Sequence, residues 1–411
     1  METETPTGPL AGMRVLDLSR VLAGPWASQI LGDLGATVFK IEQPGAGDDT
    51  RKWGPPFLQD GSNDAAYYLC CNRNKQSLAI DLAHPEGAAL VRRLAAGCDV
   101  VVENFRVGGL EKYGLDYAAL SRDNPGLIYC SVTGFGQTGP YRDRGGYDFL
   151  IQGMSGLMSV TGSAAGDPGA GPTKVGIAVS DLFTGLYAAI AILAALQHRE
   201  KTGEGQQIDC ALLDSQLSVL VNQASNYLNG GVVPRALGNQ HPNVVPYQDF
   251  RTRDGSVLVA LGNDRQFRDF CAVIDRRDLS ADPRFAEIPG RSLNREDLIC
   301  EIAWSLATWP TDDLVAAMEK AKLPGGPINR IDQILEDPHV NARGLVKSLH
   351  RDDGTPVKVL GFPAVLSRTP ATYRLAPPRM GQDTHSAMTN ELGLDEETIE
   401  RLIEMGVLGA E

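Results

Sequence analysis

Short apolar runs alternate with helix-like segments from Met13 to Val132, and this alternation restricts the fold more than any other feature of the sequence. Five runs have the length and composition of buried strands, and they span residues 13–18, 36–42, 78–81, 99–103 and 128–132. Gly24-Pro25 begins a helix-like segment after the first run, since proline is tolerated in the first helical turn, and Gly35 ends it. Alternating strands and helices predict an α/β fold with a parallel sheet that carries helices on both faces.

The first two runs and the helix between them form a βαβ unit. Such a unit has a right-handed crossover, and ligands bind beyond the carboxyl ends of its strands. We therefore expect the loops at residues 19–23 and 43–51 to face a ligand, together with the glycine-rich turn at 133–140. The chain has neither G-x-G-x-x-G after the first strand nor G-x-x-x-x-G-K-[ST], so neither a nicotinamide dinucleotide nor a P-loop nucleotide is indicated.

Charge and composition narrow the possible partners. The formal charge of -13 argues against a nucleic-acid partner and against binding to an anionic membrane surface, and an anionic substrate would need a local basic cluster. The longest apolar run, residues 182–196, is shorter than the roughly 20 residues of a membrane span, and we interpret it as a core helix.

The compartment is predicted from the cysteines and from the N-terminus. Seven cysteines without C-x-x-C spacing suggest neither a disulfide framework nor a zinc site, and they fit a reducing cytoplasm. The first ten residues show no pattern of a secretory or mitochondrial signal, so we expect a cytoplasmic protein.

The length of 411 residues predicts two or three domains, and a change of composition marks the boundaries. Residues 230–239 are rich in Gly and Pro, residues 246–260 predict a β-hairpin with an Asp-Gly turn, and residues 324–327 resemble a return linker. We expect a large domain whose N-terminal part spans 1–205, a helical linker at 206–239 and a small α+β domain at 240–330. Residues 331–411 should form the return linker and the C-terminal part of the large domain, including an acidic helix at 395–405.

Asp181 lies between two apolar runs in residues 175–187, which have the pattern of a strand, a turn and a buried helix. At a helix N-terminus an aspartate can act as an N-cap. An apolar surround with nearby N–H donors would also suit a carboxylate nucleophile for acyl transfer. The spacing alone leaves both roles open, and they are compatible.

The chain resembles the class III CoA-transferases, of the CaiB/BaiF type, through sequence segments in the same order along nearly its whole length. These segments are residues 15–25, 32–36, 40–44, 47–51, 72–75, 102–105, 134–140, 178–185 and 201–205. The resemblance implies a Rossmann-like large domain built from both termini, a smaller α+β domain and an interlocked homodimer. It also implies coenzyme A as a substrate, without a metal, nicotinamide or flavin.

For Asp181 the resemblance implies the role of nucleophile. The family's aspartate attacks an acyl-CoA thioester to form a mixed anhydride, and CoA then passes to the acceptor through an aspartyl-CoA thioester. Related racemases of α-methylacyl-CoA carry a histidine where this chain has Tyr147, and a phenol with an ordinary pKa near ~10 is a poor base. Transfer is therefore favoured, with racemisation or non-catalytic acyl-CoA binding as the alternatives.

The resemblance also implies which residues contact CoA: Arg20, Leu22, Ala23, Gln43, Ile80, Asp81, Leu82, Asn104, Phe105, Arg106, Lys112, Tyr147 and Asp148. Arg106 and Lys112 are candidate phosphate partners, although solvated surface cations would look the same in the sequence. The segment 240–243, with His241, resembles a family element that approaches the active site of the other chain, or is an ordinary loop. The glycine-rich residues 162–171 form either a surface loop or a mobile flap.

Within the family, residues 47–57, 72–75 and 129–140 are most similar to the succinate-hydroxymethylglutarate (glutarate) CoA-transferases. This similarity implies succinyl-CoA as the donor and a dicarboxylate as the acceptor.

Overall fold

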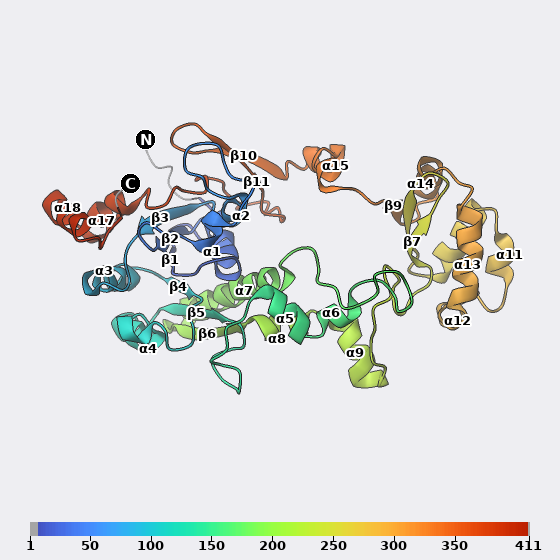
Figure 1. Ribbon diagram of the computed structural model, residues 1–411, viewed down its shortest axis with the longest axis horizontal. Coiled ribbons are helices and arrows are strands. Elements are labelled where there is room, and N and C mark those ends of the chain that lie inside the picture. The colour runs from blue at the N-terminus through green and yellow to red at the C-terminus, as the bar shows by residue number, and fades with distance from the viewer. Residues whose placement is uncertain (1–6, 410–411) are drawn as a thin grey trace. The chain divides into compact units, whose positions relative to one another are not determined.

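A computed structural model describes residues 7–409, and most of the N-terminal segment inspected for a targeting signal lies outside this range. The chain forms two compact units (Figure 1). The first contains the residues up to Leu157, Val175–Gly231 and the residues from His339 onward. The second contains Met158–Lys174 and Val232–Pro338. The first unit is therefore built from both ends of the chain.

The first unit is organised around a sheet of six parallel strands in the order β3-β2-β1-β4-β5-β6. The strands are β1 (Arg14–Asp17), β2 (Thr37–Glu42), β3 (Lys75–Ala79), β4 (Val100–Glu103), β5 (Ile128–Thr133) and β6 (Gln206–Ala211). This confirms the predicted parallel sheet. The strand order changes direction between β1 and β4, which is where open α/β sheets form a ligand crevice.

Helices cover both faces of this sheet, because successive strand residues point to opposite sides. One face packs Val15, Val38 and Val100 against α1 (Ala23–Asp33) and α7 (Val179–Thr202). The other face packs Leu16 and Val101 against α3 (Pro85–Ala96), α4 (Tyr117–Asp123), α17 (Thr384–Leu392) and α18 (Glu396–Glu404). The acidic C-terminal helix was thus predicted correctly, and it completes the core of the N-terminal strands (Figure 1).

Buried ion pairs join the N- and C-terminal parts of the first unit. Arg351 contacts Asp60 at 2.7 Å and Asp64 at 2.6 Å, and all three side chains are at most 5% exposed. Arg51 bridges Asp64 at 2.8 Å and Glu42 at 2.6 Å. Such charges are costly to bury unless they are paired, so this network fixes how the segments meet.

Short elements complete the first unit. They are η1 (Asp49–Lys52), α2 (Ala66–Leu69), η2 (Glu111–Tyr113), α5 (Asp148–Met154), α8 (Leu212–Ser218), α9 (Val221–Gly230), α16 (Pro338–Ala342), β10 (Val346–His350) and β11 (Pro356–Leu360). The helix α6 (Leu157–Val160) lies where the chain passes from one unit to the other.

The second unit is a small α+β fold. The strands β7 (Tyr247–Arg251), β8 (Ser256–Ala260) and β9 (Gly325–Pro327) form an antiparallel sheet, and β7–β8 is the hairpin predicted from the Asp-Gly turn. Its helices are α10 (Asp264–Val273), α11 (Arg277–Ala281), α12 (Ile288–Leu293), α13 (Arg295–Leu306), α14 (Thr311–Lys320) and α15 (Ile331–Leu335). Phe267, Phe270 and Leu298 are fully buried in its core.

Two predictions about local structure were wrong. The helical linker expected at 206–239 begins with β6 and then forms α8 and α9, and Val221 at the start of α9 has a φ of +39° that a continuous helix does not allow. The expected linker at Pro324–Pro327 contains β9, because Gly325 and Gly326 pair with Val259 and Leu258 through their backbones.

The start of α7 also differs from the prediction. Residues 175–178 do not form the expected strand, and the helix begins at Val179, which places Asp181 in the first turn and leaves Ala178 as the N-cap. The proposed N-cap role of Asp181 was therefore wrong. By length and composition α7 could cross a membrane, a test that core helices also pass, and Ala188, Ile192 and Ala195 are buried in the first unit's core.

Candidate active site

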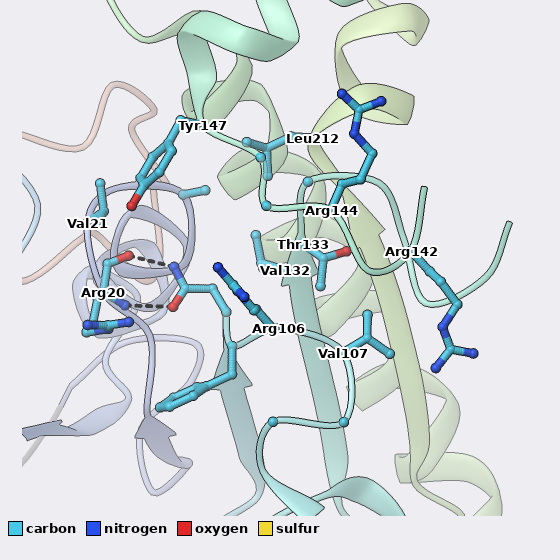
Figure 2. Close-up of a pocket in the computed structure, with 18 of the residues that line it drawn as sticks. Arg20, Val21, Arg106, Val107, Val132, Thr133, Arg142, Arg144, Tyr147 and Leu212 are labelled. Atoms are coloured by element: carbon cyan, nitrogen blue, oxygen red, sulfur yellow. Dashed lines mark hydrogen bonds between the residues drawn. The ribbon is translucent and has the colours of Figure 1, made fainter. Parts of the chain in front are cut away.

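A cavity of about 790 Å³ opens at the carboxyl edge of the sheet, where the strand order changes direction (Figure 2). It is lined by the loops after β1, β4 and β5, by the loop before α5, and by the first turn of α7. The predicted site residues that line it are Arg20, Leu22, Ala23, Asn104, Phe105, Arg106, Lys112, Tyr147 and Asp181. The sheet thus brings together side chains that are far apart in the sequence.

The loops after β1 and β4 are tied to each other by a single side chain. The Asn104 side chain accepts the Arg20 N–H at 2.9 Å and donates to the Arg20 carbonyl oxygen at 2.7 Å, as the dashed lines in Figure 2 show. Val21 has a φ of +72°, which is unfavourable for a β-branched residue, and its N–H faces the Asp48 carboxylate. Asp48 is held in turn by buried Lys40 at 2.9 Å. The β1 loop is therefore fixed before any ligand arrives.

Asp181 is a buried carboxylate at the wall of the cavity. It is 9% exposed, and it accepts no hydrogen bond from the described part of the chain. Burial raises the pKa of Asp181, the Asp148 charge raises it further, and the result is about 7. A carboxylate with a pKa near neutrality is a stronger nucleophile than an ordinary one and is still partly ionised at pH 7.

Two glycines bring the loop before α5 to the cavity. A Cβ on Gly134 would lie 2.6 Å from the backbone of Gly146, so the two chain segments touch in a way that side chains would prevent. This contact packs the loop against the end of β5 and places Tyr147 at the cavity, 68% exposed. Asp148 begins α5 but does not line the cavity, and both its oxygens are occupied by Ser180 and Gln152.

Cationic side chains line the cavity although the chain is acidic overall. They are Arg20, Arg106, Lys112, Arg142 and Arg144. Arg20 pairs with Asp49 at 3.3 Å, and Arg144 stacks over the rings of Tyr141 and Phe135. Arg106 has no ion-pair partner among residues 7–409, and Figure 2 shows it extending inward between Arg20 and Val132. Such a cluster favours an anionic ligand.

Glu103 lies beneath the loop that presents Asn104, Phe105 and Arg106. It is 6% exposed, and its carboxylate accepts the Phe105 N–H at 2.8 Å. Burial raises the pKa of Glu103 to about 7, although the Ser131 and Phe105 donors act in the opposite direction. Glu103 therefore holds the turn out of β4.

Some predicted residues do not line the cavity. Gln43 is exposed after β2, and the side chain of Ile80 is fully buried. The Asp81 carboxylate accepts the Ala83 N–H at 2.9 Å, and Leu82 is only partly buried. These residues follow β2 and β3, so they lie at the same edge of the sheet but outside this pocket.

Sequence reasoning missed several cavity residues, including Val21, Arg142, Arg144 and Leu212. The only available signal was the charged Arg142-Asp-Arg144 beside a glycine pair. His241 belongs to the second unit, where its Nδ1 accepts the N–H groups of Asn243 and Val244 at 3.1 Å each. The residues 162–171 form turns and bends without a helix or strand.

Comparison with known proteins adds independent information. Residues 10–384 match the model of CoA-transferase family III. The chain is 50% identical over 396 residues to a succinate–glutarate CoA-transferase of Agrobacterium fabrum, covering 96% of this chain and 97% of that protein. It is 41% identical over 400 residues to a succinyl-CoA:glutarate CoA-transferase of Mus musculus, covering 97% and 90%.

The fold has solved relatives as well. A CaiB/BaiF family protein from Brucella suis superimposes with a TM-score of 0.82 at 46% identity, covering 94% of this chain and 100% of that one.

Proposed function

The chain belongs to CoA-transferase family III, and on that premise we propose that it transfers CoA from succinyl-CoA to a dicarboxylate of the glutarate class. The observation that carries this proposal is the position of Asp181: a buried carboxylate without a hydrogen-bond partner in the described structure, at a cavity lined by cations. The relatives that share 41–50% identity over nearly the whole chain act on these substrates by name.

We propose that Asp181 acts as the nucleophile. Its carboxylate oxygen bonds to the acyl carbon of the donor, the carbon–sulfur bond breaks, and CoA leaves as a thiolate. The thiolate attacks the aspartyl carbonyl, which releases the donor acid and forms an aspartyl-CoA thioester. The acceptor carboxylate displaces the thiolate to give a second anhydride, and the thiolate then attacks the acceptor's acyl carbon and frees Asp181. Each intermediate is an activated acyl group, so no step needs a large activation.

The CoA contacts implied by the sequence are part of the proposal, except Asp148, whose oxygens are bound by Ser180 and Gln152 and which does not line the cavity. Arg106 and Lys112 would bind phosphate groups, because unpaired or exposed cations at a sheet edge form charge-assisted hydrogen bonds with phosphate oxygens. Asn104 and Phe105 shape the same loop. Gln43, Ile80, Asp81 and Leu82 would contact the nucleotide end outside the pocket, with Ile80 contributing only backbone, since its side chain is buried.

We also propose an assembly and a compartment for the protein. An interlocked homodimer follows from the resemblance, and the exposed Phe183, Leu186 and Ile190 on α7 supply an apolar surface that a second copy would cover. CoA binding would belong to the first unit, which corresponds to the large domain predicted from residues 1–205 and from the C-terminal part of 331–411, and the small domain was predicted at 240–330. All seven cysteines are free, which fits a cytoplasmic location.

A panel assay tests this function. Succinyl-CoA is incubated with a set of dicarboxylates and monocarboxylates, and the CoA products are separated by chromatography. Glutaryl-CoA and closely related dicarboxyl-CoA thioesters are the expected products, with one succinate released per thioester formed. Exchange of deuterium at the α-carbon of an acyl-CoA in D₂O without an acceptor would instead support racemisation, and binding without turnover would support a non-catalytic role.

A further inference from the structure

Asp148 links the start of α5 to the start of α7. Its Oδ1 accepts the Ser180 N–H at 2.8 Å, and its Oδ2 accepts the Gln152 side-chain amide at 2.7 Å. The fully buried Gln152 also accepts the Val175 N–H at 2.8 Å, which fixes its amide orientation. Asp148 is therefore held rigidly, and neither of its oxygens is directed to the cavity.

The residue next to Ser180 is Asp181. An aspartate in the first turn of a helix ordinarily gains stability from the free N–H groups there. In α7 the Ser180 N–H is already used by Asp148, and the Ser180 hydroxyl donates to Gln216 at 2.9 Å. Asp181 thus has a helix N-terminus nearby but receives no hydrogen bond from the part of the chain that is described.

We propose that Asp148 is a positioning residue that caps α7 in place of Asp181, so that the Asp181 carboxylate stays unbonded beside a second negative charge. This inference rests on the proposed role of Asp181 as nucleophile. A carboxylate without donors has its electron density available for attack on the thioester carbon. The same arrangement disfavours the ionised form of Asp181, so Asp181 loses its proton at a higher pH than a surface aspartate does.

Other charged and titratable groups around Asp181 have to be considered. Tyr67 on α2 is one of these groups. Burial raises the pKa of the Tyr67 phenol, and the charge of nearby Asp181 raises it further. The remaining groups line the same cavity and are Arg20, Asp49, Arg106, Glu111, Lys112, Tyr113, Arg142, Arg144 and Tyr147. After burial, Asp148 is the group that raises the pKa of Asp181. Removal of the Asp148 charge should therefore ease ionisation of Asp181.

Asp148→Asn tests this role, because asparagine still offers an oxygen to the Ser180 N–H but carries no charge. We expect the acidic limb of the kcat/KM profile to move toward lower pH by roughly half to one pH unit. The plateau should fall by about two- to fivefold, since a less basic carboxylate is a weaker nucleophile. The affinity for CoA should stay the same. Asp148→Ser, a smaller neutral acceptor, should move the limb in the same direction.

Asp209→Asn is the matched control. Asp209 is also a carboxylate of the first unit that accepts a backbone N–H, from Gln137 at 2.8 Å, but it does not line the cavity. The pH profile of kcat/KM for Asp209→Asn should match that of the wild type.

An unchanged acidic limb in a folded, CoA-binding Asp148→Asn protein would overturn the inference. Loss of cooperative melting in both Asp148→Asn and Asp148→Ser would overturn it as well. Such a result would show that Asp148 only stabilises the fold. Either result leaves the proposed function intact as long as the wild type forms an acyl-Asp181. Absence of that acyl group in the wild type would instead refute the proposed function itself.

Discussion

Gly185 of α7 lies directly against Ala23 of α1: a Cβ built on Gly185 would come within 2.6 Å of the Ala23 carbonyl oxygen. Ala23 lines the cavity, and Asp181 lies one helical turn before Gly185. This close contact sets the distance between the β1 loop and the first turn of α7, and so the shape of the site.

Gly185→Ala should separate the two helices. The methyl group meets a backbone oxygen that cannot move away easily, so we expect a loss of about 1–3 kcal/mol in the free energy of unfolding and a clear fall in kcat/KM. Urea unfolding and the transfer assay measure the two effects. Gly176→Ala is the control, because a Cβ on exposed Gly176 has open space around it, and it should change neither quantity. Equal behaviour of the two variants would contradict the packing argument.

Asp181→Asn should abolish transfer and yet stabilise the protein at high pH. Asp181 has a pKa of about 7 in the folded chain against 3.8 in the unfolded chain, so the folded state binds its proton more tightly. The wild type then loses stability as the pH rises from about 4 to 7, by on the order of 2–4 kcal/mol. The variant lacks this loss. Thermal melting at pH 5 and pH 8 should show a gain for Asp181→Asn that is larger at pH 8, whereas a larger gain at pH 5 would contradict the sign.

The pH profile of the wild type should report the same group. Asp181 must be ionised to attack, so kcat/KM should fall below about pH 7 on the acidic side. Glu103 has a similar pKa but acts on the turn out of β4. Glu103→Gln should therefore weaken CoA binding while the acidic limb stays in place. Loss of the limb in that variant would mean that Glu103, and not Asp181, controls the profile.

Arg106→Gln should weaken binding of CoA thioesters. A charge-assisted hydrogen bond to phosphate is worth about 1.5–3 kcal/mol, so the dissociation constant should rise roughly 10- to 100-fold. The salt dependence of binding should become less steep at the same time. Arg122→Gln is the control, since Arg122 is an exposed arginine of the same unit that does not line the cavity. Isothermal titration calorimetry at two salt concentrations measures both effects, and equal affinities for the two variants would exclude Arg106 as a phosphate ligand.

Arg351→Met should destabilise the first unit. It leaves the buried carboxylates of Asp60 and Asp64 with fewer cations, although Arg51 and Arg379 still contact them. We expect a loss of about 3 kcal/mol in the free energy of unfolding, measured by urea denaturation.

The matched change at Arg330 provides the comparison. Arg330 and Asp332 form an ion pair with both side chains more than 60% exposed, and solvent screens such a pair. Arg330→Met should change stability by less than about 1 kcal/mol. A similar loss in both arginine variants would show that burial does not decide the contribution of these pairs.

The sheet was predictable from the sequence because buried parallel strands are short, continuous apolar runs. The failures share a cause, which is that partners distant in the sequence decide local structure. Asp181 is not an N-cap because α7 begins two residues earlier, at Val179, and Asp148 from another helix accepts the Ser180 N–H. Gly325 and Gly326 have no strand propensity, yet the edge of β8 pairs with them. Arg142 and Arg144 reach the cavity only because Gly134 and Gly146 let two loops touch, a contact that no local pattern reveals.

Covalent capture of the acyl group tests the central claim most directly. The wild type is mixed with succinyl-CoA without an acceptor, quenched with borohydride or hydroxylamine, and digested for peptide mass spectrometry. The account predicts a modified carboxyl at Asp181, present in the wild type and in Gly176→Ala and absent from Asp181→Asn. A modified peptide that lacks Asp181, or full transfer activity in Asp181→Asn without any trapped species, would contradict it.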